Sequence, residues 1–181
     1  MKTAFPLTIE AKTGERITFL GVTVKNGIEY LEAINEVQPN TGPPMHVHYK
    51  QDEYFTVVSG KMGYQEQGGE KKYAGPGETS LFKAGVPHKF WNAGKEVLVC
   101  TGYLTPPDNF IYFISRVFES SNKNGGRPGI YDAAFLLNRY RSDFDILEIP
   151  AFVRKVIFPI VLFLGNLTGK NKKFADAPGA L

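Results

Sequence analysis

The sequence predicts a mainly β domain followed by a C-terminal α-helical extension. Turn-forming residues recur at short intervals through the first hundred positions, and the chain holds 19 glycines and 12 prolines among its 181 residues. Short strands separated by turns at this spacing are typical of an antiparallel sandwich or barrel. Pro106-Pro107 then marks a change to apolar residues at helical spacing. We therefore predict a β domain over residues 1–105 and a helical extension over residues 106–181.

The β-rich segments are bounded by turn residues on both sides. Asn26-Gly27 is a strong hairpin signal between the first two of them. Later boundaries fall at Gly60, at Gly68-Gly69, and at the prolines and glycines near residues 75 and 85. We expect strands over Arg16–Val24, Gly27–Val37, Tyr54–Ser59, Met62–Gln65, Thr79–Phe82, His88–Asn92 and Val97–Tyr103.

Three helices are expected in the extension. The first follows Asp108 as N-cap, because apolar residues from Phe110 to Phe118 recur at helical spacing. A Gly-rich loop separates it from a second helix near Tyr131–Tyr140, and Pro150 is suited to the first turn of a third. We expect the final residues, from Lys170, to be frayed.

Composition and charge exclude several classes of protein. The chain is 43% hydrophobic and 22% charged, as in ordinary globular proteins. Its net charge of +3 comes from the tail, so we expect no nucleic-acid groove in the β domain. The single Cys100 excludes an intrachain disulfide framework and lies in an apolar run, which predicts a buried thiol. Met1–Pro6 lacks the features of a signal peptide, so the expectation is a cytoplasmic protein.

All three histidines of the chain fall in a pattern that suits a metal. His46 and His48 are two residues apart, so on a strand both imidazoles point to one face. His88 begins a second set of inward positions with Phe90 and Asn92. Neutral imidazoles together with one carboxylate suit a divalent Fe, Mn, Ni, Cu or Zn.

The carboxylate of this set is expected to be Glu53. It follows His48 by five residues, and this odd step would place it on the opposite face of an unbroken strand. A bulge or short turn through Tyr49–Asp52 would return the side chain inward. Asp52 is the alternative ligand.

Two motifs resemble those of the cupin superfamily. The first reads Gly42-Pro43-Pro44-Met45-His46-Val47-His48, with Glu53 five residues later and Gly60 after six more. The second runs from Gly77 through Gly85-Val86-Pro87-His88 to Asn92. Gly42 stands closer to the first histidine than usual, and Lys83 replaces a customary proline. The resemblance implies a jelly-roll β-barrel whose metal is bound by His46, His48, Glu53 and His88, and its register favours Glu53 over Asp52.

The amino-acid sequence around the first motif is most similar to that of small cupins of the quercetin dioxygenase type. This resemblance implies a metal-dependent dioxygenase acting on a small molecule, with Glu53 as both ligand and catalytic proton acceptor. A cupin isomerase and a binding or sensing cupin without turnover are the alternatives. Phe55, Phe82 and Phe90 either line a site for a flat or hydrophobic ligand or belong to the barrel core.

The C-terminal extension carries the most apolar run of the chain, from Val156 to Leu164. Nine residues of helix are too short to span a bilayer core of about 30 Å. The run is expected to pack on the barrel or on a second subunit, which favours a homodimer. Alternatively, residues 150–173 lie in a membrane interface, where their basic residues meet anionic lipid. The stretch 109–150 is similar to helical tails of some cupins, a resemblance that carries no chemical information.

Overall fold

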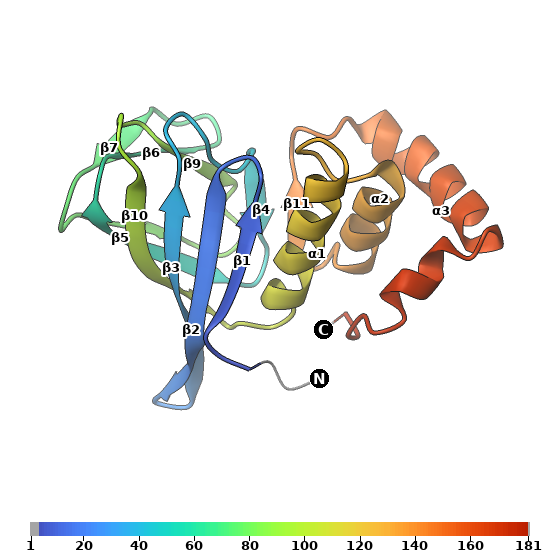
Figure 1. The fold of residues 1–181 in the computed structure, drawn as a ribbon, viewed down its shortest axis with the longest axis horizontal. Coiled ribbons are helices and arrows are strands. Elements are labelled where there is room, and N and C mark those ends of the chain that lie inside the picture. The colour runs from blue at the N-terminus through green and yellow to red at the C-terminus, as the bar shows by residue number, and fades with distance from the viewer. Residues whose placement is uncertain (1–3, 181) are drawn as a thin grey trace.

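Two antiparallel sheets form the β part of the protein (Figure 1). The computed structural model describes residues 4–180, so the predicted absence of a leader at Met1–Thr3 lies outside the described residues. One sheet has the order β1-β2-β3-β10-β5-β8 and the other the order β11-β4-β9-β6-β7. The first consists of Leu7–Ala11, Glu15–Lys25, Ile28–Val37, Leu98–Thr105, Asp52–Ser59 and Thr79–Phe82, and the second of Phe144–Ile146, His46–His48, His88–Asn92, Met62–Glu66 and Lys72–Ala74.

The mainly β, jelly-roll prediction is confirmed, although the strands of residues 4–180 form two separate sheets and no closed barrel. The predicted strands are all present, each within a few residues of its expected bounds. At the hairpin between β2 and β3, Asn26 and Gly27 both have positive φ, 54° and 79°. This is the conformation that an Asn-Gly turn supplies at low cost. Strands β1, β7 and β11 were not predicted from the sequence.

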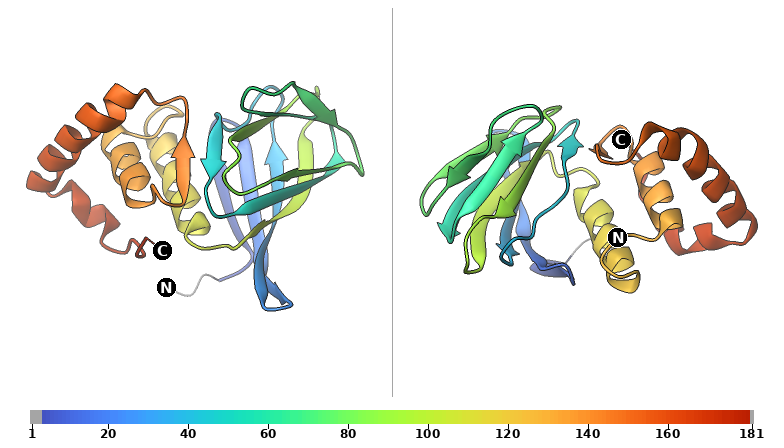
Figure 2. Two further views of the ribbon diagram at one scale, coloured as in Figure 1. Left: turned by 180° about the vertical axis from the view of Figure 1, so that it is seen from behind. Right: turned by 90° about the horizontal axis from the view of Figure 1, so that it is seen from above.

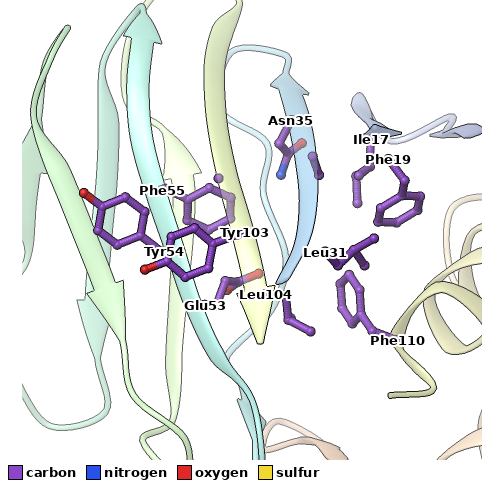
Figure 3. Close-up of a pocket in the computed structure, with 12 residues that line it drawn as sticks. Ile17, Phe19, Leu31, Asn35, Glu53, Tyr54, Phe55, Tyr103, Leu104 and Phe110 are labelled. Carbon is purple, nitrogen blue, oxygen red and sulfur yellow. The ribbon is translucent and has the colours of Figure 1, made fainter. Parts of the chain in front are cut away.

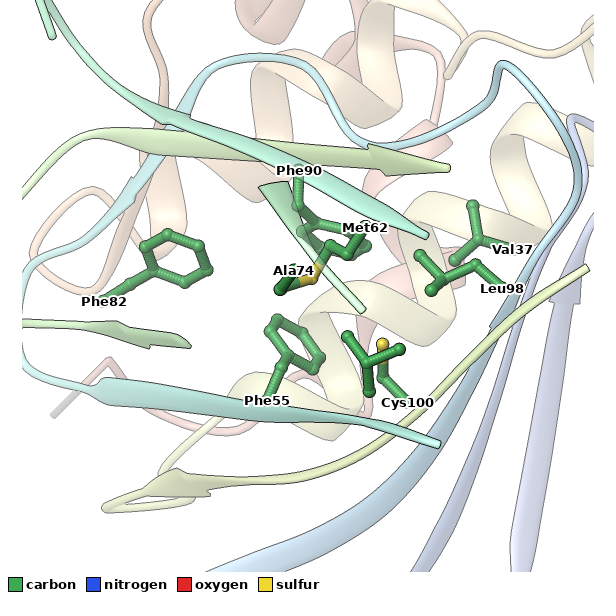
Figure 4. Close-up of a cluster of buried hydrophobic side chains, with 9 residues drawn as sticks. Val37, Phe55, Met62, Ala74, Phe82, Phe90, Leu98 and Cys100 are labelled. Atoms are coloured by element: carbon green, nitrogen blue, oxygen red, sulfur yellow. The ribbon is translucent and has the colours of Figure 1, made fainter. Parts of the chain in front are cut away.

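A hydrophobic core fills the space between the sheets (Figure 4). It arises from strand alternation, because every second residue of β5 and β9 is buried. Cys100 belongs to this core, as predicted, and burial raises the pKa of its thiol to about 12. The members are Val37, Phe55, Val57, Met62, Ala74, Phe82, Phe90, Leu98 and Cys100.

The helical part lies to one side of the sheets (Figure 2). It contains α1 (Phe110–Lys123), α2 (Ile130–Arg139), a π-helical turn (Val153–Ile157) that runs directly into α3 (Phe158–Leu167), and a 3₁₀ turn (Lys170–Phe174). Because Pro159 has no N–H to donate, the wider π turn just before it accommodates the break in helical hydrogen bonding.

Two expectations for the helical part were wrong. Asn109, and not Asp108, precedes α1, and no side chain caps this helix. Asp108 instead accepts a hydrogen bond from Gln51 Nε2 at 2.9 Å. The tail after Lys170 is packed and not frayed, because Phe174 is buried and stacks on Phe135 at 4.2 Å between ring centroids.

The extension also contributes to the second sheet. Strand β11 pairs with β4 over three positions, opposite His48, Val47 and His46. Phe118 of α1 packs with Phe19 on β2 and Leu31 on β3 of the first sheet. The division into a β domain and a helical extension between residues 105 and 106 remains a prediction. Residues 144–146 belong to the predicted extension but form a strand of the second sheet.

Candidate metal centre

Four side chains from the two sheets meet between them. His46 and His48 come from β4, His88 from β9 and Glu53 from β5. One potential ligand atom of each lies within 4.8 Å of those of the others. The pairing of His46 with His88 places the histidines on neighbouring strands of one sheet, while Glu53 faces them from the other.

The odd spacing of Glu53 is explained by a change of sheet. Residues 49–51 are not in a strand, and β5 begins at Asp52 in the opposite sheet. Gln51 is fully buried and bonds Asp108, which anchors this crossing. Strand parity therefore restarts at β5 and directs Glu53 inward, as the predicted turn through residues 49–52 requires.

Asp52, the alternative ligand, is engaged elsewhere. Its carboxylate accepts hydrogen bonds from Lys83 Nζ at 2.8 Å and from the backbone N–H of Ala84 at 2.9 Å. Lys83 is the residue that departs from the usual cupin motif, and it fixes Asp52 outside the cluster. Geometry thus favours Glu53 in the candidate set.

Two of the three histidines are oriented for a metal by backbone carbonyls. His46 Nδ1 lies 2.9 Å from the carbonyl of Pro44, and His88 Nδ1 lies 2.9 Å from that of Val86. Because a carbonyl only accepts, each Nδ1 carries the proton and each Nε2 presents a lone pair.

The contact between His88 and Glu53 then requires a cation. His88 Nε2 and Glu53 Oε2 are 3.0 Å apart, and with Nδ1 protonated a neutral imidazole would set two acceptors against each other. Either a proton on Nε2 or a metal shared by both side chains resolves this. The buried Nδ1 of His48 has no hydrogen-bond partner among residues 4–180. The donor set therefore fits one divalent metal.

The electrostatics of the cluster keep His46, His48 and Glu53 in metal-binding protonation states. Burial lowers the pKa of His46 to about 4 and that of His48 to about 3, so both are neutral at physiological pH. Burial alone would raise the pKa of Glu53, but contact with His88 and the nearby imidazoles hold it at about 2. Near pH 7 the site therefore offers the neutral imidazoles of His46 and His48 and the ionised carboxylate of Glu53.

Aromatic rings from both parts of the chain support the histidines. Phe82 stacks on His88 with 4.1 Å between centroids and 1° between ring planes. His48 contacts Phe144 of β11 at 5.5 Å and Phe110 of α1 at 5.6 Å. Two residues of the stretch 109–150 thus pack against a candidate ligand.

A cavity of about 840 Å³ lies between the sheets and the helical part, and His46, His48 and Glu53 line it. Most of its walls are apolar, and many come from the extension, including Phe113, Ile114 and Leu137. All three phenylalanines considered from sequence are core residues, and Phe90 also lines this cavity. A smaller void of about 40 Å³ lies beside Glu53 and Asn35 (Figure 3).

Two polar residues of the cavity were missed by the sequence analysis. Asn35 Nδ2 donates a hydrogen bond to Glu15 Oε1 at 3.1 Å. Burial raises the pKa of Glu15 to about 7, and the charge of Glu53 adds to this effect. Asn35 lies on the inward face of β3, where Leu31 and Val37 are also buried. A polar residue among apolar inward positions was the feature of the sequence that could have identified it as a site residue.

Comparison with known proteins gives the family of the β part. Residues 33–103 match the family described as Cupin domain, a stretch that includes all four candidate ligands. Residues 33–103 form a cupin domain. The superfamily predicted from the two motifs is thereby confirmed, without distinction of subtype.

Curated relatives of this cupin domain are named as oxidoreductases. The oxidoreductase iacF of Pestalotiopsis fici is 37% identical over 68 residues, which cover 36% of this chain and 33% of that protein. The probable oxidoreductase virH of Hypocrea virens is 38% identical over 52 residues, 29% of this chain and 24% of that protein. The chain thus matches only a quarter to a third of the length of these relatives.

Among solved structures, KdgF from Halomonas sp. is similar at a TM-score of 0.49 and 16% identity. The likeness covers 57% of this chain and 91% of that chain. Similarity at this level carries no information about activity.

Proposed function

We propose that this protein is a metal-dependent oxidoreductase that acts on an apolar small molecule, with one divalent metal bound by His46, His48, Glu53 and His88. The observation that carries the proposal is a four-residue ligand cluster, its ligand atoms within 4.8 Å, that borders a cavity of about 840 Å³. Structural metal sites are closed, whereas catalytic ones keep access for a substrate. When bound, a divalent Fe, Mn, Ni, Cu or Zn would supply Lewis acidity and, for the redox-active metals, reactivity toward O₂.

Proton transfer is assigned to Glu15 in this proposal. Glu53 was expected to serve as both ligand and proton acceptor, but a carboxylate with a pKa of about 2 is a weak base. A general base works best when its pKa lies near the working pH. Glu15 meets this condition with a pKa of about 7, and it lines the same cavity as the ligands. Asn35 orients its carboxylate by the 3.1 Å hydrogen bond.

The walls of the cavity favour an apolar substrate. Arg127 is the one Lys or Arg side chain among the described lining residues, which also include the carboxylates of Glu15, Glu53, Asp145 and Glu148. Asp145 is paired with Arg154, and a bound divalent metal would add two positive charges, so the charges around the cavity nearly balance. The mostly apolar surface suits a hydrophobic or aromatic compound with one oxygen-bearing group directed at the metal.

Metal analysis is the first test. Protein purified without added metal is expected to hold about one divalent metal per chain by elemental analysis, and His88→Ala is expected to lose it. Val58→Ala, at an exposed position near the end of strand β5, should retain the metal. A parent protein that stays metal-free after reconstitution would refute the proposal.

Turnover separates the enzyme from a sensing cupin. Reconstituted protein should consume O₂ with at least one member of a panel of flavonols and diketones, and His88→Ala should not. Saturable binding of a panel compound to the metal-loaded protein, without O₂ uptake for any metal, would instead establish the sensing alternative.

We also propose a homodimer formed through the β2–β3 hairpin. Strand β1 pairs with β2 only from Glu15 to Phe19, so residues 20–25 form an open edge within the described part of the chain. Leu20, Val22 and Val24 on this edge are 45%, 39% and 64% exposed. An open edge with exposed β-branched residues is suited to antiparallel pairing with its own copy. Light scattering should give a dimer mass for the parent and a monomer mass for Val22→Pro; a monomeric parent would refute it.

A further inference from the structure

One face of the helical stretch from Phe152 to Leu167 is apolar and exposed. Phe152, Phe163 and Leu167 are 64%, 64% and 71% exposed, and Val156, Ile160 and Leu164 are 41%, 52% and 54% exposed. These residues recur at steps of mostly three or four, the spacing of one helix face. An apolar stripe of this size is uncommon on a protein surface unless something covers it.

The opposite side of the same helix holds it in the molecule. Phe158 is buried, and Val161 and Leu162 pack against the core of the helical part. Gly165 allows the closest approach, because a Cβ there would lie 2.1 Å from Tyr131 Cε2. The helix is therefore fixed on α2, with its apolar stripe turned away.

The stripe is not covered by the sheets. Among the labelled elements, α3 lies farthest from the β part in each view (Figures 1 and 2). The expected packing of helices on the barrel is therefore found for α1, through Phe118, and not for α3; packing of α3 on a second subunit stays a prediction. No helix of residues 4–180 is long and apolar enough to cross a membrane.

Basic residues flank the stripe and lack acidic neighbours in their own segment. From residue 150 onward the chain has Arg154, Lys155, Lys170, Lys172 and Lys173, and Asp176 as its one acid. Arg154 and Lys173 pair with Asp145 and Asp132, and Asp176 pairs with Arg116 at 2.6 Å. Lys155, Lys170 and Lys172 are exposed and direct positive charge to the solvent on the same segment.

We propose that this segment is a membrane-docking surface, in which the apolar face of α3 enters the interface of an anionic bilayer and Lys155, Lys170 and Lys172 contact its headgroups. Exposed apolar side chains beside lysines are the composition that binds such interfaces. A second copy of the chain fits less well, because self-association through α3 would bring two such positive segments together.

The test uses the full-length protein and sedimentation with vesicles of phosphatidylcholine alone or with 30% phosphatidylglycerol. The parent should bind the anionic vesicles at least tenfold more strongly than the neutral ones, and high salt should reduce this binding. Phe163→Glu/Leu167→Glu should lower binding to anionic vesicles at least tenfold, and Lys170→Glu/Lys172→Glu at least threefold.

Val58→Glu/Leu81→Glu provides the matched control. Val58 on β5 and Leu81 on β8 are exposed apolar residues, 52% and 42% exposed, so the pair adds the same two negative charges without touching α3, and vesicle binding should not change. Circular dichroism establishes that each variant is folded, so a loss of binding reports on the surface. Equal recovery of the parent in the supernatant with both vesicle types would overturn the proposal. A second result would also overturn it: the parent binds no vesicles, and Phe163→Glu/Leu167→Glu converts a dimer to a monomer. That result would show that a second copy of the chain covers this face.

Discussion

The two sheets and the helical part contribute different things to the candidate site. All four candidate ligands lie on β4, β5 and β9, and their register is set by strand pairing within the sheets. The helical part supplies much of the apolar cavity wall and two aromatic contacts to His48. The comparison teaches that the sheets determine which chemistry is available, whereas the extension determines the shape and polarity of the space around it.

The largest expected effect is on the metal and comes from the sheets. Glu53→Gln removes the one anionic ligand and should weaken divalent metal binding by more than a hundredfold, beyond the 10–100-fold typical of residues behind the ligands. The adjacent Asp52→Asn is the matched control and should change affinity less than twofold, because Asp52 bonds Lys83 and Ala84. Competition titration with a chromogenic chelator measures both. Equal losses would mean that Asp52 shares in binding.

Phe144 joins the two regions, and its truncation should mainly affect stability. The side chain is 4% exposed and stacks on Phe113 at 4.6 Å between centroids. Phe144→Ala is expected to lower the free energy of unfolding by about 3 kcal/mol, from lost burial and a residual cavity. Urea denaturation checks this, and Phe163→Ala at an exposed position should cost less than about 0.5 kcal/mol. A small effect at Phe144 would indicate that the extension is only loosely joined to the sheets.

The raised pKa of Glu15 predicts a stability that falls as pH rises. A carboxyl group with a pKa of about 7 in the folded chain, and its ordinary value near 4.5 when unfolded, keeps its proton longer in the folded state. Stability is therefore lost between about pH 4.5 and pH 7 and stays lost above it. For the metal-free protein, Glu15→Gln should raise the free energy of unfolding by about 2 kcal/mol at pH 8.5, a value reduced to allow for partial exposure of the side chain. At pH 4 the same substitution should change the free energy of unfolding by almost nothing.

Asp52→Asn provides the contrasting pH control for Glu15. The pKa of Asp52 is lowered: burial would raise it, but hydrogen bonds from Lys83 and Ala84 outweigh this effect. Stabilisation by Asp52 is thus present at neutral pH and disappears in acid, the opposite dependence to Glu15. A Glu15→Gln gain that is equal at pH 4 and pH 8.5 would contradict the assignment.

The smallest effect concerns the cavity wall. Ile114 of α1 lines the cavity, and Ile114→Asp should weaken binding of an apolar fluorescent probe by about tenfold, since it places a charge on an apolar surface. Metal content should stay near one per chain, because α1 provides no candidate ligand. Val58→Asp, outside the cavity, should leave probe binding unchanged. Loss of metal from a folded Ile114→Asp variant would show that the extension affects the chemistry as well as the shape.

The candidate ligands could be predicted from sequence because their positions depend on local rules. His46 and His48 share a face by strand parity, and the cupin motifs supplied the register for Glu53. The residues that were missed depend on distant contacts. Glu15 gains its raised pKa only from the burial that folding creates, and β11 is three residues long, with Asp145 at its centre, so it has no strand pattern of its own. The apolar run of α3 was visible, but which side it exposes depended on its packing against α2.

Strand β4 depends on a segment that follows it late in the chain. On one side, β4 pairs with β9 at a single position, His46 with His88. On the other side, all three of its residues pair with β11. Nearly a hundred residues separate His48 from its partner Phe144. During synthesis at about 5–20 residues per second, the strand that carries two of the three histidines therefore waits several seconds for its second neighbour. Throughout that interval the nascent sheets have an incomplete histidine strand, and the helical part must be made before the site is enclosed.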